Sequence, residues 1–149
     1  MISLNKDSIS HVNSSIPSLP KGLNGLKGAQ LPDGNLVISG GFNLHSGVSD
    51  EHLLYKVGLD QWRKVGTMKE ARCWHSSVWI DGRLLTTGGW NPYDAKNRLK
   101  ITPHHEEFSF DGGVKERKEM PMSLDDHAAT IFDRNKMIVT GGYLFETVT

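Results

Sequence analysis

A sequence motif occurs three times along the chain, and this repeat limits the folds that the chain can adopt. The middle copy, at 68–90, reads MKEARCWHSSVWIDGRLLTTGGW. A copy at 22–42 reads GLNGLKGAQLPDGNLVISGGF, and one at 120–143 reads MPMSLDDHAATIFDRNKMIVTGGY. A recurring unit of about fifty residues indicates structural units that stack on one another, since one unit cannot bury its own apolar faces.

Each copy keeps a turn and a pair of glycines. The turn aspartates Asp33, Asp81 and Asp133 are 48 and 52 residues apart. Because the Asp-Gly dipeptide favours positive φ angles, Asp33-Gly34 and Asp81-Gly82 predict two-residue hairpin turns. The third copy has Asp-Arg-Asn-Lys instead, which predicts a wider turn. The glycine pairs end the second apolar segment of each copy and are Gly40-Gly41, Gly88-Gly89 and Gly141-Gly142.

Short apolar segments predict an all-β protein. They are rich in β-branched or aromatic residues and bounded by Gly, Asp, Asn or Pro, and no stretch shows a helical period. We expect strands at 36–39, 53–57, 76–80, 84–87, 107–110, 128–132 and 137–140. The charged run at 115–119 is expected to be an outer edge strand, since charges on an edge discourage pairing with other chains. The glycine pairs are interpreted as points of close backbone approach.

These residues resemble the kelch repeat. The residues that match its pattern are Arg72, His75, Asp81, Gly82, Gly88 and Gly89, followed by a tyrosine and a tryptophan with six residues between them, as in Tyr55 and Trp62. The resemblance implies a partial kelch-type β-propeller of about two and a half blades, each a four-stranded antiparallel sheet. In that fold Tyr55 and Trp62 would pack between adjacent blades, and His75 and His127 would make a structural hydrogen bond.

The copies also depart from the pattern. In the first copy we align Asn24 and Lys27 with Arg72 and His75, and in the third copy Leu124 replaces the arginine. After Gly89 the tyrosine position falls near Glu107 or Phe108, and the tryptophan position falls near Val114.

The repeat divides the chain into an irregular lead and two and a half blades. Residues 1–16 are expected to be a poorly ordered lead or the remnant of an earlier blade's outer strand, and the repeats occupy 17–149 as units at 17–66, 67–119 and 120–149. A propeller needs about 4 to 8 blades. The chain is therefore expected to be a fragment of a longer propeller, which is the favoured alternative, to associate with copies of itself through open blade edges, or to be only marginally stable with open edges.

Composition excludes several classes of partner. The net charge is zero and the pI is about 7.1, so neither nucleic acid nor an anionic membrane surface is an expected partner. No apolar run approaches the ~20 residues of a membrane span, and the first residues lack a secretory signal. The single cysteine, Cys73, excludes an internal disulfide and favours a cytoplasmic location.

We expect no catalytic residues, no metal and no cofactor. The seven histidines do not follow a metal-ligand spacing, and His104 and His105 would point to opposite faces of a strand. A copper oxidase of the galactose oxidase type is the alternative, because such enzymes also carry kelch repeats. Cys73, Tyr93 and Tyr143 are present, but they match no motif of those enzymes.

Protein binding is the expected function. In kelch propellers that act as adaptors, partners contact the loops before each first strand and after each Gly-Gly. Carried over to this chain, the candidate contact residues are Arg72, Trp74, Trp90, Asn91, Tyr93 and Asn43. Arginine and aromatic side chains dominate interface hot spots. Arg72 has an equally plausible structural role as a brace between blades. A truncated, non-functional copy of a longer protein is a further alternative.

Overall fold

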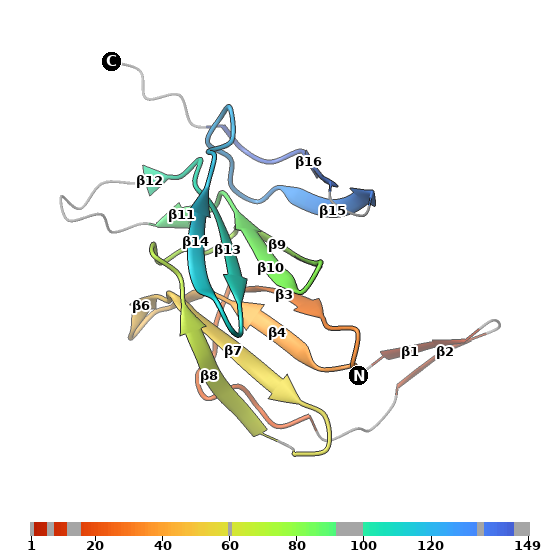
Figure 1. Ribbon diagram of the computed structural model, residues 1–149. Helices are drawn as coiled ribbons and strands as arrows, with labels where there is room; N and C mark the ends of the chain where they lie inside the picture. The colour runs from red at the N-terminus through yellow and green to blue at the C-terminus, as the bar shows by residue number, and fades with distance from the viewer. Residues whose placement is uncertain are drawn as a thin grey trace.

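The computed structural model describes residues 2–5, 8–11, 16–59, 61–91, 100–133 and 136–144, and all regular structure there is β (Figure 1). The strands are β1 (Ile2–Asn5), β2 (Ser8–His11), β3 (Lys27–Gln30), β4 (Leu36–Ser39), β5 (Phe42–Asn43), β6 (Gly47–Val48), β7 (Glu51–Lys56), β8 (Gln61–Thr67), β9 (Ser76–Ile80), β10 (Arg83–Thr87), β11 (Trp90–Asn91), β12 (Lys100–Ile101), β13 (His105–Ser109), β14 (Gly113–Arg117), β15 (Ala128–Asp133) and β16 (Lys136–Thr140). No helix in these residues could cross a membrane.

Two four-stranded antiparallel sheets form complete blades. The first blade has the order β3-β4-β7-β8, and the second has the order β9-β10-β13-β14. β15 and β16 pair with each other and form the first half of a third blade. The innermost strands β3, β9 and β15 lie side by side, so the sheets are stacked face to face as in a propeller (Figure 1). The expected fold class, a partial β-propeller, is confirmed.

The main apolar core lies between the first and second blades. It consists of Leu31, Val37, Leu54, Leu84 and Phe108. The first three belong to the first blade and the last two to the second. We call the side of a blade that points to the next blade along the chain its forward face, and the opposite side its rear face. The core is therefore the forward face of the first blade packed against the rear face of the second.

The pairing registers fix how the repeats correspond. Tyr55 lies opposite Trp62, and Phe108 lies opposite Val114. Phe108, not Glu107, therefore occupies the tyrosine position of the second blade. Because successive residues of a strand point to opposite faces, Tyr55 points away from its neighbour Leu54 and hence away from the second blade. Tyr55 and Trp62 thus lie on the rear face of the first blade, where Trp62 Nε1 donates to the Pro17 carbonyl at 2.9 Å.

The alignment of the first copy proves to be shifted by one residue. The isolated bridges pair Asn24 with Phe42 and Cys73 with Trp90, each partner following a glycine pair. Asn24 is therefore equivalent to Cys73, so Leu23 and Leu26, not Asn24 and Lys27, stand at the positions of Arg72 and His75. In the third copy the bridge between Asp125 and Tyr143 places Leu124 and His127 where they were expected.

The hairpin turns match the expectation in part. Ile80 pairs directly with Arg83, so Asp81-Gly82 is a two-residue turn, and both residues have positive φ angles of 49° and 74°. In the first copy the Leu31 amide donates to the Asn35 carbonyl at 2.8 Å, which leaves a three-residue loop at 32–34. In the third copy pairing continues to Asp133 and Lys136 with a shift of register after Ile131, so a strand irregularity takes up part of the extra length.

The strands that the sequence did not predict are the polar or very short ones. β3 and β8 have few apolar residues, and β5–β6 and β11–β12 are two-residue hairpin arms within the polar loops. β14 is an outer edge strand that overlaps the charged run at 115–119. The described part of the lead contains an antiparallel hairpin, β1–β2, where either a poorly ordered lead or the remnant of an earlier blade's outer strand was expected.

Candidate functional site

The loops that precede the inner strands and the loops that follow the glycine pairs lie at the same end of the blades. We call this end the loop end; β6, β11 and β12 mark it on the left of Figure 1. A backbone ladder joins its repeats. The Trp74 amide donates to the Gly25 carbonyl at 2.8 Å, and the Asp126 amide donates to the Trp74 carbonyl at 2.8 Å. The loops that precede the inner strands are therefore joined to one another through their backbones.

The three residues of this ladder share an uncommon backbone conformation. Gly25, Trp74 and Asp126 have φ angles of 63°, 51° and 48°. A bulky residue such as tryptophan rarely adopts a positive φ angle. Strain of this kind persists only where the surrounding contacts impose it, and it clusters at functional positions. Trp74 thus stands out as the most constrained aromatic residue of the loop end.

An aromatic residue follows each glycine pair at the loop end. These residues are Phe42, Trp90 and Tyr143. Trp74 lies next to Trp90, with ring centroids 4.9 Å apart and planes inclined at 53°. The other side of the Trp74 ring covers Gly25, where an added Cβ would lie 3.0 Å from the ring. Both tryptophans are half-buried, so they form a fixed aromatic surface that is still accessible to a partner.

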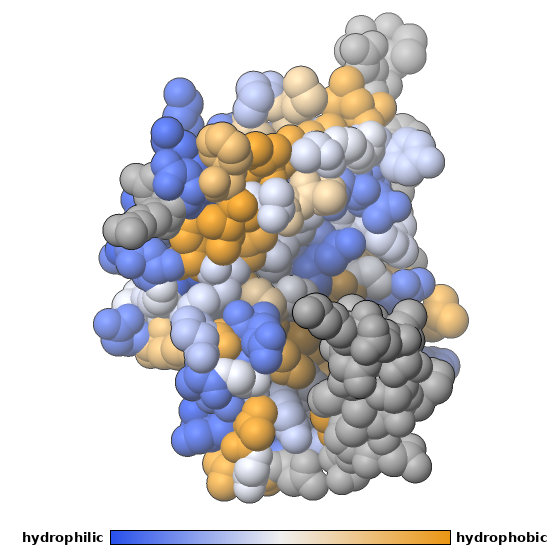
Figure 2. All heavy atoms as spheres, turned by 90° about the vertical axis from the view of Figure 1, so that its right-hand side faces the viewer, coloured by the Kyte–Doolittle hydropathy of each residue, from blue (hydrophilic) through white to orange (hydrophobic). Residues whose placement is uncertain are grey.

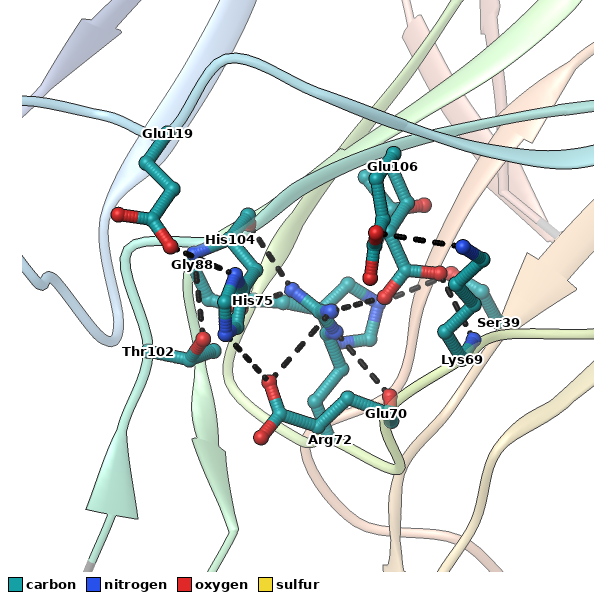
Figure 3. A network of polar contacts seen from close by, with 12 residues as sticks. Ser39, Lys69, Glu70, Arg72, His75, Gly88, Thr102, His104, Glu106 and Glu119 are labelled. Carbon is teal, nitrogen blue, oxygen red and sulfur yellow. Dashed lines mark hydrogen bonds and ion pairs between the residues drawn. The ribbon is translucent and has the colours of Figure 1, made fainter.

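Arg72 is a brace and not a surface residue. Its side chain has an exposed fraction of 0%. Its Nη1 donates to the carbonyls of Gly88 and His104, each at 3.0 Å, and its Nη2 forms an ion pair with Glu106 (Figure 3). A guanidinium with no exposed surface cannot anchor a partner. Of the two roles expected for Arg72, the structure supports the structural one.

A group of ion pairs surrounds Arg72 at the rim of the loop end (Figure 3). Glu70 pairs with Lys100, and His104 Nδ1 lies 3.1 Å from a carboxylate oxygen of Glu119. Burial alone would raise the pKa of Glu70, but the hydrogen bond from Lys100 and further contacts outweigh it and hold this pKa below its usual value. The network links the loop before β9 to the loop before β13, and so fixes both around Arg72.

The histidine of the repeat has a structural role at His75, where its hydrogen bond joins two blades. His75 Nε2 lies 2.9 Å from Ser39 Oγ, which connects the second blade to the first. Burial, with a contribution from the positive charge of Arg72, holds the pKa of His75 well below its usual value. Burial also lowers the pKa of His127. The two rings lie against Gly40 and Gly88, where a Cβ would be 2.7 and 2.5 Å from the ring carbon Cε1.

Cys73 is buried and chemically protected. Its Sγ donates to the Trp90 carbonyl at 3.2 Å. Burial, with a contribution from Asp125, raises the pKa of the thiol to about 12. A thiol of that pKa is not a nucleophile near neutral pH. In the part of the chain that the structure describes, no group of three or more His, Cys, Asp or Glu side chains is arranged to hold a metal ion.

Two of the other candidate contact residues, Asn91 and Asn43, lie at the loop end. Asn91 lies in β11 opposite Lys100 and is half-buried. Asn43 caps its own turn, since its Oδ1 accepts from the His45 amide at 2.8 Å. Tyr93 lies outside the described residues. Sequence reasoning missed Leu44, which is 87% exposed at the tip of the β5–β6 hairpin. A leucine directly after Asn43 in an otherwise polar loop was the signal that could have found it.

Comparison with known proteins places the chain among β-propellers. No family model matches the sequence. The chain is similar to beta-scruin of Limulus polyphemus, with 31% identity over 93 residues, which are 60% of this chain and 10% of that protein. It is also similar to the solved structure of YjhT, with a TM-score of 0.74 and 20% identity over 87% of this chain and 37% of that one. The chain thus matches only a small part of the length of either protein.

Proposed function

We propose that this chain, which belongs to the kelch-repeat family, is a protein-binding module that uses its loop end and carries out no catalysis of its own. One observation carries the proposal. Apolar side chains are presented outward at the loop end, away from the core between the blades, on loops that backbone hydrogen bonds join to one another. The residues concerned are Leu44, Trp74, Trp90, Tyr143 and Leu144, of which Leu44, Tyr143 and Leu144 are 87%, 66% and 52% exposed.

The exposed apolar side chains of the loop end favour binding of a partner in terms of free energy. Exposed apolar side chains gain free energy when a partner removes them from water, by roughly 25 cal/mol per Å². The Trp74–Trp90 pair is already ordered by its ring contact and by the backbone ladder. Binding there requires little further ordering, which is the usual advantage of a preorganised surface. The proposed location is cytoplasmic, since the single thiol suits a reducing compartment.

The binding surface is tested with variants at the two ends of the strands. Leu44→Lys combined with Trp90→Ala removes apolar surface from the loop end. Leu59→Lys is the matched control, because Leu59 is 57% exposed in the turn between β7 and β8, at the opposite end of the strands. Each variant and the unaltered chain are used as affinity baits under identical conditions, and bound proteins are quantified by mass spectrometry.

The expected result is at least one protein that the unaltered chain and Leu59→Lys both retain, and that the loop-end variant loses by tenfold or more. Its direct binding is then measured with the purified components. Equal retention by all three baits, with circular dichroism showing the same β content, would contradict the use of the loop end.

A further inference from the structure

The loop end carries two adjacent carboxylates that are not neutralised within the described part of the chain. Asp125 and Asp126 lie in the loop before β15, and neither forms an ion pair with another described residue. In contrast, Glu51 at the same end pairs with Lys21 at 3.1 Å. A positive charge from a partner can therefore pair with Asp125 and Asp126 without displacing an existing ion pair.

The environment of Asp125 favours the approach of a cation. Its oxygen Oδ1 is buried and has no hydrogen-bond partner among the described residues. Burial, with a contribution from the charge of Asp126, raises the pKa of Asp125. An opposite charge nearby favours the ionised form of a carboxylate. A cation at this position would thus offset both the burial of Asp125 and its repulsion from Asp126.

Aromatic residues are joined to both aspartates through the backbone. The Asp126 amide donates to the Trp74 carbonyl at 2.8 Å, and the Trp74 ring lies beside that of Trp90. Asp125 exchanges two backbone hydrogen bonds, of 2.9 and 3.3 Å, with Tyr143, which is 66% exposed. Cations bind to the faces of aromatic rings, and tryptophan binds them best. Two kinds of group that attract cations therefore meet in these loops.

The cations near these loops are already engaged within the chain. The ion pairs are Arg72–Glu106, Lys21–Glu51 and Lys100–Glu70. Arg72 is also fully buried, so its charge is not presented to a partner. Lys27, at the start of β3, lies close enough to the buried His75 and His127 to lower their pKa values. The charge that Asp125 and Asp126 offer to a partner is therefore negative.

We propose that the partner bound at the loop end is a basic protein segment, with an arginine or lysine side chain packed on the rings of Trp74 and Trp90 and a positive charge paired with Asp125 and Asp126. This inference rests on the proposed function and names the class of partner. Arginine suits the site better than lysine, because its planar guanidinium stacks on aromatic rings and pairs with carboxylates through two hydrogen bonds. An acidic segment would be repelled, since complementary charge selects among partners.

The opposite end of the strands provides matched controls. Figure 2 shows apolar side chains gathered on this side of the molecule, over the upper part where β15 and β16 lie. Phe132, near the end of β15, is 68% exposed. Asp111 is an exposed carboxylate in the turn between β13 and β14. Phe132→Ala and Asp111→Asn therefore remove an aromatic ring and a negative charge without changing the loop end.

The test begins with a phage-displayed library of random peptides of about ten residues, selected on the purified chain. The enriched peptides should contain more arginine and lysine, and less aspartate and glutamate, than the unselected library. The most enriched peptide is then synthesised twice, once with its arginines and once with citrulline, an uncharged isostere, in their place. Fluorescence anisotropy gives both dissociation constants, and the citrulline peptide should bind at least tenfold more weakly.

Variants of the chain locate the bound peptide. Asp125→Asn combined with Asp126→Asn should weaken binding at least tenfold. Asparagine has the same shape and tolerates the positive φ angle of Asp126, so the β-type circular dichroism should be unchanged. Trp90→Leu, which keeps an apolar side chain but removes the ring, should weaken binding at least threefold. Phe132→Ala and Asp111→Asn should bind as the unaltered chain does.

A measurement on the unaltered chain keeps the test independent of any variant that does not fold. Raising the salt concentration from about 50 to about 500 mM should weaken binding of the arginine peptide at least fivefold, because salt screens exposed charges. Binding that does not depend on salt, or that Asp125→Asn with Asp126→Asn leaves unchanged, would overturn the basic partner.

The outcomes separate this inference from the proposed function. Neutral or acidic peptides that lose their binding in the variant Leu44→Lys with Trp90→Ala would overturn the basic partner and leave protein binding at the loop end standing. Basic peptides that this variant still binds fully would overturn both. No enrichment over an unrelated bait would overturn the basic segment, whereas the proposed function is decided by its own affinity baits.

Discussion

Replacing the buried ion pair between Arg72 and Glu106 should reveal how the second blade differs from the first. The positions equivalent to Arg72 and Glu106 in the first copy are Leu23 and Leu53, so the same fold accepts two leucines there. Breaking a buried ion pair by removing one partner costs about 3–5 kcal/mol, because the other charge is left uncompensated. Arg72→Leu and Glu106→Leu should each destabilise the chain by about that amount.

The double variant, Arg72→Leu with Glu106→Leu, should be more stable than either single variant. Replacing both ions with apolar residues removes the cost of burying charge. Some loss remains, because the carbonyls of Gly88 and His104 lose a donor and the Lys69 amide loses Glu106, its acceptor at 2.9 Å. Each such loss costs about 1–3 kcal/mol where water cannot replace the partner. Relief of the cost of burying the two charges, about 1–4 kcal/mol, offsets part of these losses, so we expect the stability of the double variant to lie between that of the unaltered chain and that of the single variants.

Urea unfolding followed by tryptophan fluorescence and circular dichroism gives the three free energies. If a single variant is already unfolded in the absence of urea, recovery of the folded signal in the double variant is the decisive observation. The reasoning is refuted if Arg72→Leu costs less than about 1 kcal/mol, since a fully buried paired guanidinium cannot be that dispensable. It is also refuted if the two single effects simply add in the double variant, because contacting residues should be coupled.

Three further predictions concern the core, its titration and its thiol. Gly66→Ala should destabilise the chain by about 1–3 kcal/mol, since the new Cβ would lie 2.5 Å from the Phe108 ring. The control Gly22→Ala should change the free energy of unfolding by less than about 0.5 kcal/mol, because there is open space around Gly22. Equal effects of the two substitutions would contradict the packing between blades. Burial, with a contribution from Arg72, lowers the pKa of His52 to about 4, so the unfolded chain binds an extra proton between about pH 4 and 6.5. The contribution of His52 to the free energy of unfolding should therefore be fully present above about pH 6.5, and about 2 kcal/mol of it should be lost at pH 5. A urea midpoint that did not change between pH 7 and pH 5 would contradict this prediction. Cys73 should react with a thiol reagent at least a hundredfold more slowly in the folded chain than in urea, and comparable rates would show that the thiol is accessible.

The repeat, and with it the fold class, could be predicted from the sequence because the signals are local. Asp81-Gly82 requires positive φ angles, and each Gly-Gly pair marks an approach too close for a Cβ, as the distances at Gly40, Gly88 and Gly89 show. In strands β4, β9 and β10 the apolar residues alternate with polar ones or follow one another directly. This pattern can be recognised without knowing which strands lie beside them. Trp74 and Trp90 were placed in loops by their position in the repeat alone.

Only the tertiary structure decided which side each residue faces and what covers it. The sequence left two roles open for Arg72, and burial beside Glu106, which is 34 residues away, made it a brace. The sequence predicted that Tyr55 and Trp62 pack between blades, and strand alternation in the structure decides which face of the first blade they occupy, namely the rear face, where Tyr55 is buried. β3, β8 and the hairpin arms β5–β6 and β11–β12 were missed, because their pairing depends on neighbouring strands and not on their own composition. Burial and strand pairing depend on residues that are distant in the chain, whereas turns and repeat period do not, and this difference separates what could be predicted from what could not.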